Sequence, residues 1–178
     1  MSKNKIYCIV GPSGVGKTTV TRYLCEQEGY KDIASLTTRP MREGEVQGVG
    51  HYYVTYEEFH KYDMVAYTMF DGNEYGVPKS MVDEADFYVI DIAGVKMLRE
   101  CYHDKDIVVV YLSITPEEAA RRMRMRGDSE EKIAKRLAND AEMFADMDGL
   151  APDYIIDANG DFESVVNALR NIVVQSEA

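Results

Sequence analysis

The chain has 178 residues, of which 46% are hydrophobic and 29% charged, and its formal net charge is −11. This length and composition suit one globular domain spanning 1–178. The acidic charge argues against a nucleic acid partner, because binding a phosphate backbone needs a basic face.

The cysteines and the apolar runs bear on cellular location. Cys8, Cys25 and Cys101 are odd in number and have no metal-ligand spacing, so we expect reduced thiols in a cytoplasmic protein. No signal-peptide pattern and no apolar run of about eighteen residues occurs, so no membrane partner is expected. The oligomeric state stays open.

Apolar runs alternate with helix-period segments, which predicts an α/β fold with a parallel five-stranded sheet flanked by helices. The expected strands are 6–10, 30–34, 87–90, 107–112 and 153–156. The expected helices are 17 to about 28, about 94–102, one that begins after the N-cap Thr115, and 162–174.

Two segments interrupt this alternation. Residues 35–77 contain short alternating runs and predict a small mixed α/β insertion. Residues 121–143 form a charged helical stretch broken at Arg126-Gly127-Asp128-Ser129, which indicates two helices meeting at a mobile corner. Both segments could close over a site and exclude water.

A glycine loop lies between the first strand and the first helix. Gly11, Gly16, Lys17 and Thr18 satisfy the pattern G-x-x-x-x-G-K-[ST]. Such a loop turns backbone N–H groups toward phosphate oxygens, while the lysine reaches the β- and γ-phosphates and the hydroxyl binds Mg²⁺. The alternative is a tight turn with an incidental lysine. The predicted ATP-binding residues are Gly11, Pro12, Ser13, Gly14, Val15, Gly16, Lys17, Thr18 and Thr19.

Asp91 follows the apolar strand at 87–90. Ligands gather at the carboxyl ends of parallel strands, so this carboxylate is predicted to be a second anchor for Mg²⁺ beside Thr18. The alternative is an N-cap for the helix that follows, and one residue could serve both purposes.

Arg39 and Arg42 lie in the segment Thr37-Thr38-Arg39-Pro40-Met41-Arg42-Glu43-Gly44-Glu45. Together with the loop Gly-Pro-Ser-Gly-Val-Gly-Lys-Thr-Thr, this segment resembles the guanylate kinase family. The resemblance continues in order through Gly48, Tyr53-Val54, Phe59, Asn73-Glu74-Tyr75-Gly76, Asp91-Ile92, Arg126-Gly127 and Arg136-Leu137.

The resemblance implies transfer of the ATP γ-phosphoryl group, with Mg²⁺, to a nucleoside monophosphate. It also implies an acceptor-binding insertion at about 35–77 and a lid at about 123–140. Ser35, Arg39, Arg42 and Tyr75 match the grip on the acceptor phosphate, and Arg122, Arg126 and Arg136 match the lid arginines. With Lys17 and Arg39, these arginines form the predicted catalytic set. Arg121 and Arg124 point elsewhere on the helix, so we expect them to be in solvent or on the surface distal to ATP.

Several positions depart from the family pattern. His51 occupies the position at which the family has a phosphate-binding tyrosine. An imidazole there could make phosphate binding pH-sensitive. Ala66 and Val77 fall where guanine-reading polar residues are expected, and an Asp-x-Asp stretch is shortened to Asp91-Ile92-Ala93-Gly94. Guanine selectivity is therefore expected to be weak, or rebuilt from other groups. The candidates are Tyr67, Thr68, Asp71 and Glu74.

These departures leave three hypotheses. A kinase of nucleoside monophosphates, with GMP as the leading acceptor, fits the phosphate-binding residues. A kinase of another nucleotide or of a sugar phosphate fits the missing guanine readers, and Tyr75-Gly76-Val77-Pro78 also resembles ribose 1,5-bisphosphate kinases. A catalytically silent binding module is disfavoured by the intact glycine loop. A regulatory ATP binder has no support in the sequence beyond the missing guanine readers.

Overall fold

The structure is a computed structural model that describes residues 4–145 and 147–177. Its main sheet has the order β6-β1-β7-β8 with every pairing parallel. The strands are β1 (Lys5–Val10), β6 (Phe87–Val89), β7 (Asp106–Ser113) and β8 (Tyr154–Asp157). The α/β class with a parallel sheet flanked by helices is as predicted.

The strand expected at 30–34 is reduced to one isolated bridge between Asp32 and Phe87, so the sheet of named strands has four strands and not five. The main chain at Lys31 is hydrogen-bonded to the β6 edge of the main sheet: its carbonyl accepts from the N–H groups of Asp86 and Phe87. The N–H of Ile33 also donates to the Phe87 carbonyl, and two residues later Ser35 begins a strand of the second sheet.

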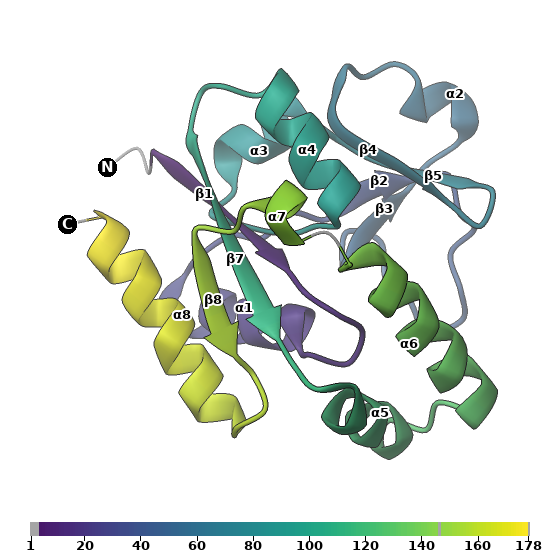
Figure 1. The fold of residues 1–178 in the computed structure, drawn as a ribbon. Helices are drawn as coiled ribbons and strands as arrows, with labels where there is room; N and C mark the ends of the chain where they lie inside the picture. Colours follow the sequence, from purple (N-terminus) through teal and green to yellow (C-terminus); the bar gives the residue numbers. More distant parts are fainter. Residues whose placement is uncertain (1–3, 146, 178) are drawn as a thin grey trace.

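Helices cover both faces of the main sheet (Figure 1). Because successive strand residues face opposite sides, Ile9 and Val110 pack in the cluster with helices α1 and α8, whereas Cys8 and Val109 pack in the cluster with α4 and α7. These helices are α1 (Lys17–Glu28), α4 (Ile92–Cys101), α7 (Met147–Leu150) and α8 (Phe162–Glu177).

The predicted mixed insertion forms a second sheet in the order β3-β2-β5-β4. Its elements are β2 (Ser35–Thr37), β3 (His51–Tyr53), α2 (Tyr56–Phe59), β4 (Met64–Phe70) and β5 (Asn73–Pro78), followed by α3 (Lys79–Glu84). Asp71 and Gly72 both have positive φ and close the β4–β5 hairpin, the backbone that a tight two-residue turn requires. The hairpin register sets Thr68 opposite Tyr75 and Ala66 opposite Val77.

The charged stretch near the C-terminal half is two helices, α5 (Pro116–Met125) and α6 (Glu130–Met143), as predicted. Gly127 adopts φ 90° at the corner, and the Ser129 side chain caps α6. A small apolar cluster that includes Met123 and Ile133 joins the two helices. Among the described residues, no helix is both long enough and apolar enough to cross a membrane.

Candidate active site

Two cavities meet at the glycine loop. The first, of about 450 Å³, lies between the loop, the β4–β5 hairpin, the start of α4 and the end of α6. The second, of about 790 Å³, lies between the loop, α5, α6 and the start of α8. Both are lined by Ser13, Lys17, Phe70, Asp140 and Met143. Two phosphorylated molecules could therefore lie end to end, with their phosphates meeting beside Lys17.

The glycine loop is shaped by close packing and by left-handed backbone. A Cβ on Gly11 would lie 2.5 Å from the Leu112 carbonyl oxygen, so this position admits no side chain. Gly16 has φ 100° and is the N-cap of α1, which leaves the first N–H groups of α1 free to face a phosphate. Of the predicted ATP-binding residues, Gly11 lines the first cavity, Pro12 lines neither, and the rest line the second.

Lys17 is held at the junction of the two cavities. Its Nζ donates to the carbonyl oxygens of Gly11 at 2.6 Å and Pro12 at 3.1 Å. Burial lowers the pKa of Lys17 to about 8; Asp140 opposes this change and the charge of Arg136 adds to it. The two hydrogen bonds fix the position of the ammonium group, and the lowered pKa means that it loses its proton at a lower pH than an ordinary lysine.

Asp140 is a site residue that the sequence analysis missed. Its carboxylate accepts hydrogen bonds from Ser13, through the backbone N–H at 2.8 Å and through Oγ at 3.4 Å. One signal was present: Asp140 follows Arg136 by four residues on α6, so the two side chains share a helix face.

The predicted lid arginines line the second cavity, with different partners. Arg122 donates to the carbonyl oxygens of Val15 (3.3 Å), Ala158 (2.7 Å) and Gly160 (3.1 Å), which ties α5 to the glycine loop and to the turn before α8. Arg126 and Arg136 both pair with Asp128, Arg136 at 3.9 Å. They are less firmly fixed than Arg122, since these pairs involve a single carboxylate.

Two other arginines of α5 lie at the solvent-exposed surface, as expected. Arg124 pairs with Glu130 outside the cavities, as expected. Arg121 lines the second cavity, although 59% of its side chain is exposed and it pairs with Glu118. Both side chains are therefore solvent-exposed, as expected, and Arg121 also reaches the second cavity.

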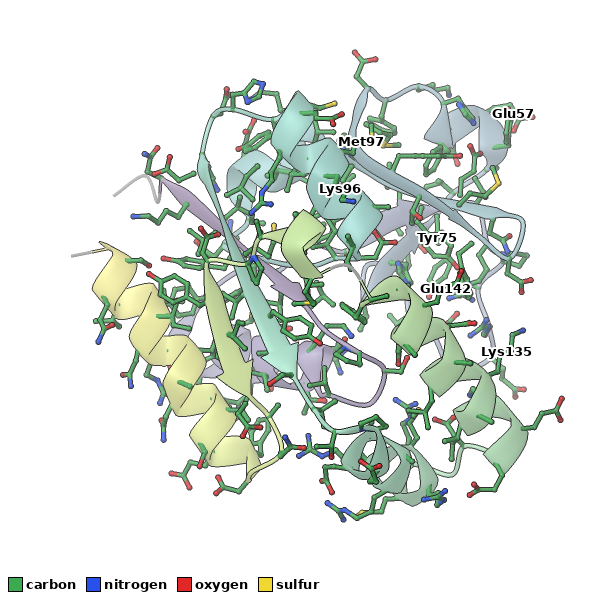
Figure 2. All side chains as sticks on the ribbon, in the orientation of Figure 1. Glu57, Tyr75, Lys96, Met97, Lys135 and Glu142 are labelled. Carbon is green, nitrogen blue, oxygen red and sulfur yellow. The ribbon has the colours of Figure 1, made fainter. Side chains whose placement is uncertain are left out.

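Three predicted acceptor residues lie together on the first cavity: Ser35, His51 and Tyr75. Ser35 Oγ and His51 Nδ1 are hydrogen-bonded at 2.8 Å, and the His51 ring packs edge-on against Tyr75 at 5.4 Å. Burial, then the charge of Arg39, lowers the pKa of His51, so the imidazole is neutral near pH 7. Figure 2 labels Tyr75 on the insertion and Glu142 on α6.

The two acceptor arginines, in contrast, line a smaller cavity of about 320 Å³ on the other side of Tyr75. Arg39 is only 9% exposed. Its guanidinium group forms a bidentate ion pair with the Glu45 carboxylate, with N–O distances of 2.9 and 3.0 Å. Arg42 binds Glu45 through its backbone N–H and leaves its side chain in solvent. Tyr75 lines both cavities, so it is the link between the two halves of the predicted phosphate grip.

Ala66 and Val77 are 1% and 0% exposed and do not line the cavity, so no polar base reader replaces them in place. Of the four substitutes considered, Tyr67 and Thr68 line the first cavity and Asp71 does not. Glu74 does not line it either; its carboxylate accepts from Tyr67 and pairs with His60, both at 3.0 Å.

The predicted metal ligands lie on neighbouring cavities. Asp91 lines the first cavity, and its Oδ1 accepts from the Gly94 N–H at 2.6 Å and caps α4. Its Oδ2 has no partner among the described residues, so capping and metal binding are compatible. Thr18 lines the second cavity. Two oxygen donors suit Mg²⁺, which takes most of its other ligands from phosphates and water.

Comparison with known proteins gives a consistent result. A family model described as guanylate kinase matches residues 3–176. The guanylate kinase of Symbiobacterium thermophilum is 36% identical over 99% of this chain and 87% of that protein. That of Zymomonas mobilis subsp. mobilis is 37% identical over 94% and 82%. A crystal structure of guanylate kinase from Anaplasma phagocytophilum has a TM-score of 0.69 and 28% identity, covering 99% of this chain and 87% of that one.

Proposed function

The chain belongs to the guanylate kinase family, and on that premise we propose that it transfers the γ-phosphoryl group of ATP to GMP. It is a nucleoside monophosphate kinase, so the family resemblance inferred from the motifs is confirmed. The observation that carries the proposal is the pair of cavities that share Lys17, because one phosphoryl donor and one acceptor can meet there.

In this proposal ATP occupies the second cavity. The N–H groups of the glycine loop bind its phosphates, and Lys17 lies beside the β- and γ-phosphates. Arg122, Arg126 and Arg136 stabilise charge on the transferred group. Mg²⁺, held by Thr18 and Asp91, would neutralise charge on the phosphate oxygens when bound.

GMP occupies the first cavity, with its phosphate toward Ser35, His51 and Tyr75. Arg39 and Arg42 approach from the far side of Tyr75, after part of the Arg39–Glu45 pairing gives way to phosphate oxygens. Transfer is direct and in line, so catalysis consists of positioning and charge stabilisation, without a covalent enzyme intermediate.

The segments at about 35–77 and 123–140 act as the acceptor-binding insertion and the lid. Residues of both segments reach the junction: Phe70 at the tip of the β4–β5 hairpin, and Asp140 on α6. Met143, the last residue of α6, lies just beyond the lid and also lines both cavities. Closure of Phe70 and Met143 over the junction would exclude water from the transferring group. The three free cysteines fit the reducing cytoplasm as the location.

The comparisons support neither a sugar phosphate acceptor nor a silent binding module. A panel of nucleoside monophosphates and sugar phosphates, assayed for ADP production, tests the acceptor directly. GMP is expected to give the highest kcat/KM. A higher kcat/KM with any other acceptor would show that the proposed acceptor is wrong.

A further inference from the structure

Tyr88 carries a hydroxyl group that has no hydrogen-bond partner within 4–145 and 147–177. It is only 7% exposed and lies on β6, where it pairs in register with Cys8. Its hydroxyl forms no hydrogen bond with any described residue. Among the described residues, no fully buried side-chain oxygen lacks a partner, so this hydroxyl must reach open space. The cavity that Tyr88 lines is the first one.

The other deeply buried tyrosines behave differently. The hydroxyl of Tyr102 donates to Asp83 at 2.8 Å, and that of Tyr7 is bonded to Ser176 Oγ at 2.6 Å. Both residues are at most 2% exposed. A buried hydroxyl is usually paired, because an unpaired one loses its hydration without compensation. The Tyr88 hydroxyl differs from these two because it opens into the first cavity, where its partner is water or a bound ligand that takes the place of water.

The side chains that surround Tyr88 in the core are apolar, so its hydroxyl is a polar group on an apolar part of the cavity wall. Tyr88 belongs to the same buried cluster as Ala66, Val77 and Ile90. Burial raises the pKa of Tyr88, with smaller contributions from Cys8 and Asp91, so the phenol remains protonated and can donate at any working pH.

Tyr88 also lies on a different wall from the phosphate-binding residues. Ser35, His51 and Tyr75 belong to the second sheet, whereas Tyr88 is on an edge strand of the main sheet. A cavity of about 450 Å³ is large enough for a nucleotide. With the phosphate on one wall, the base can extend toward the other.

We propose that the Tyr88 hydroxyl donates a hydrogen bond to an acceptor atom of the guanine base, O6 or N7, and is a specificity-determining residue of the acceptor site. This inference rests on the proposed function, which places GMP in the first cavity. It supplies one polar contact to the base in a site where Ala66 and Val77 offer none.

The test compares Tyr88→Phe with Tyr102→Phe, a matched loss of a buried phenol hydroxyl away from both cavities. Equilibrium dissociation constants are measured for GMP, for 2-aminopurine ribonucleoside monophosphate, which lacks O6, and for 7-deaza-GMP, which lacks N7. Tyr88→Phe is expected to raise the Kd for GMP by roughly 3- to 12-fold, the usual effect of one neutral hydrogen bond. Its Tm should not fall, whereas that of Tyr102→Phe should fall while its Kd for GMP stays unchanged.

The analogues identify the atom. If the hydroxyl donates to O6, Tyr88→Phe will not weaken the 2-aminopurine nucleotide further; if it donates to N7, the same holds for 7-deaza-GMP. Equal weakening of all three ligands, or no weakening of GMP, would overturn the inference. The wild-type protein provides a check that needs no variant, since it must bind one analogue less tightly than GMP. Failure of the wild type to phosphorylate GMP would instead refute the proposed function.

Discussion

The carboxylate of Asp140 accepts a hydrogen bond from the backbone N–H of Ser13 at 2.8 Å, which joins α6 to the glycine loop. Backbone N–H groups of such a loop ordinarily bind phosphate oxygens. A carboxylate of the chain therefore occupies a position that suits the phosphates of ATP. We therefore expect nucleotide binding to displace Asp140 from Ser13.

Asp140→Asn is expected to bind ATP more tightly. The substitution removes a negative charge beside the triphosphate and weakens the competing contact with Ser13. The Kd for ATP should fall about tenfold, which lies between the ~1 kcal/mol of a fully solvated charge pair and the ~4 kcal/mol of a pair near a protein surface. Titration with ATP at fixed ionic strength measures it. Glu142→Gln, an exposed position on the same helix, is the control. A Kd that rises in Asp140→Asn, or falls equally in both variants, would contradict this prediction.

Lys17→Ala is expected to reduce kcat/KM by about 10³-fold or more, because the ammonium group stabilises charge that develops during transfer. Arg39→Ala should have a comparable effect through the acceptor phosphate. Steady-state kinetics with ATP and GMP provide the measurement. Lys135→Ala, an exposed lysine on α6, should remain close to wild type. Near wild-type turnover in both Lys17→Ala and Arg39→Ala would exclude the assigned mechanism.

Activity is expected to depend on the charge of Lys17, whose pKa is lowered to about 8. The lysine is a cation below that pH and becomes neutral above it, so kcat/KM for ATP should fall as pH rises through about 8. Because Asp140 raises the pKa of Lys17, Asp140→Asn should move this fall to lower pH. Profiles of kcat/KM between about pH 6.5 and 9.5 measure both effects, and a flat profile in the wild type would count against them.

Arg122 and Arg126 are expected to differ in their effect on stability. Arg122 donates to three main-chain carbonyls, so Arg122→Ala should lower the free energy of unfolding by about 2 kcal/mol as well as weaken ATP binding. Arg126 is paired only with Asp128 among the described residues, and 55% of its side chain is exposed. Arg126→Ala should therefore reduce kcat without lowering stability. Denaturant unfolding curves measure the free energy of unfolding of both variants. An equal loss of stability in Arg122→Ala and Arg126→Ala would contradict this prediction.

The sequence by itself determined the features that depend on neighbouring residues. The glycine loop is eight consecutive residues, so its spacing alone predicts a phosphate site between a strand and a helix. Apolar runs and helix-period segments located the four strands of the main sheet and helices α1, α4, α5 and α8. The break at 126–129 separated α5 from α6, because backbone preferences there are local. The order of motifs was sufficient to place the chain in its family.

The tertiary structure decided what depends on distant partners. Asp140 and Ser13 are separated by 127 residues, and no local pattern indicates their contact. The expected strand at 30–34 was wrong because the chain leaves β6 for the second sheet after one bridge. The unpaired hydroxyl of Tyr88 is visible only when its surroundings are known. Pairing and burial are set by packing between elements, whereas a sequence pattern reports only the propensity of each element.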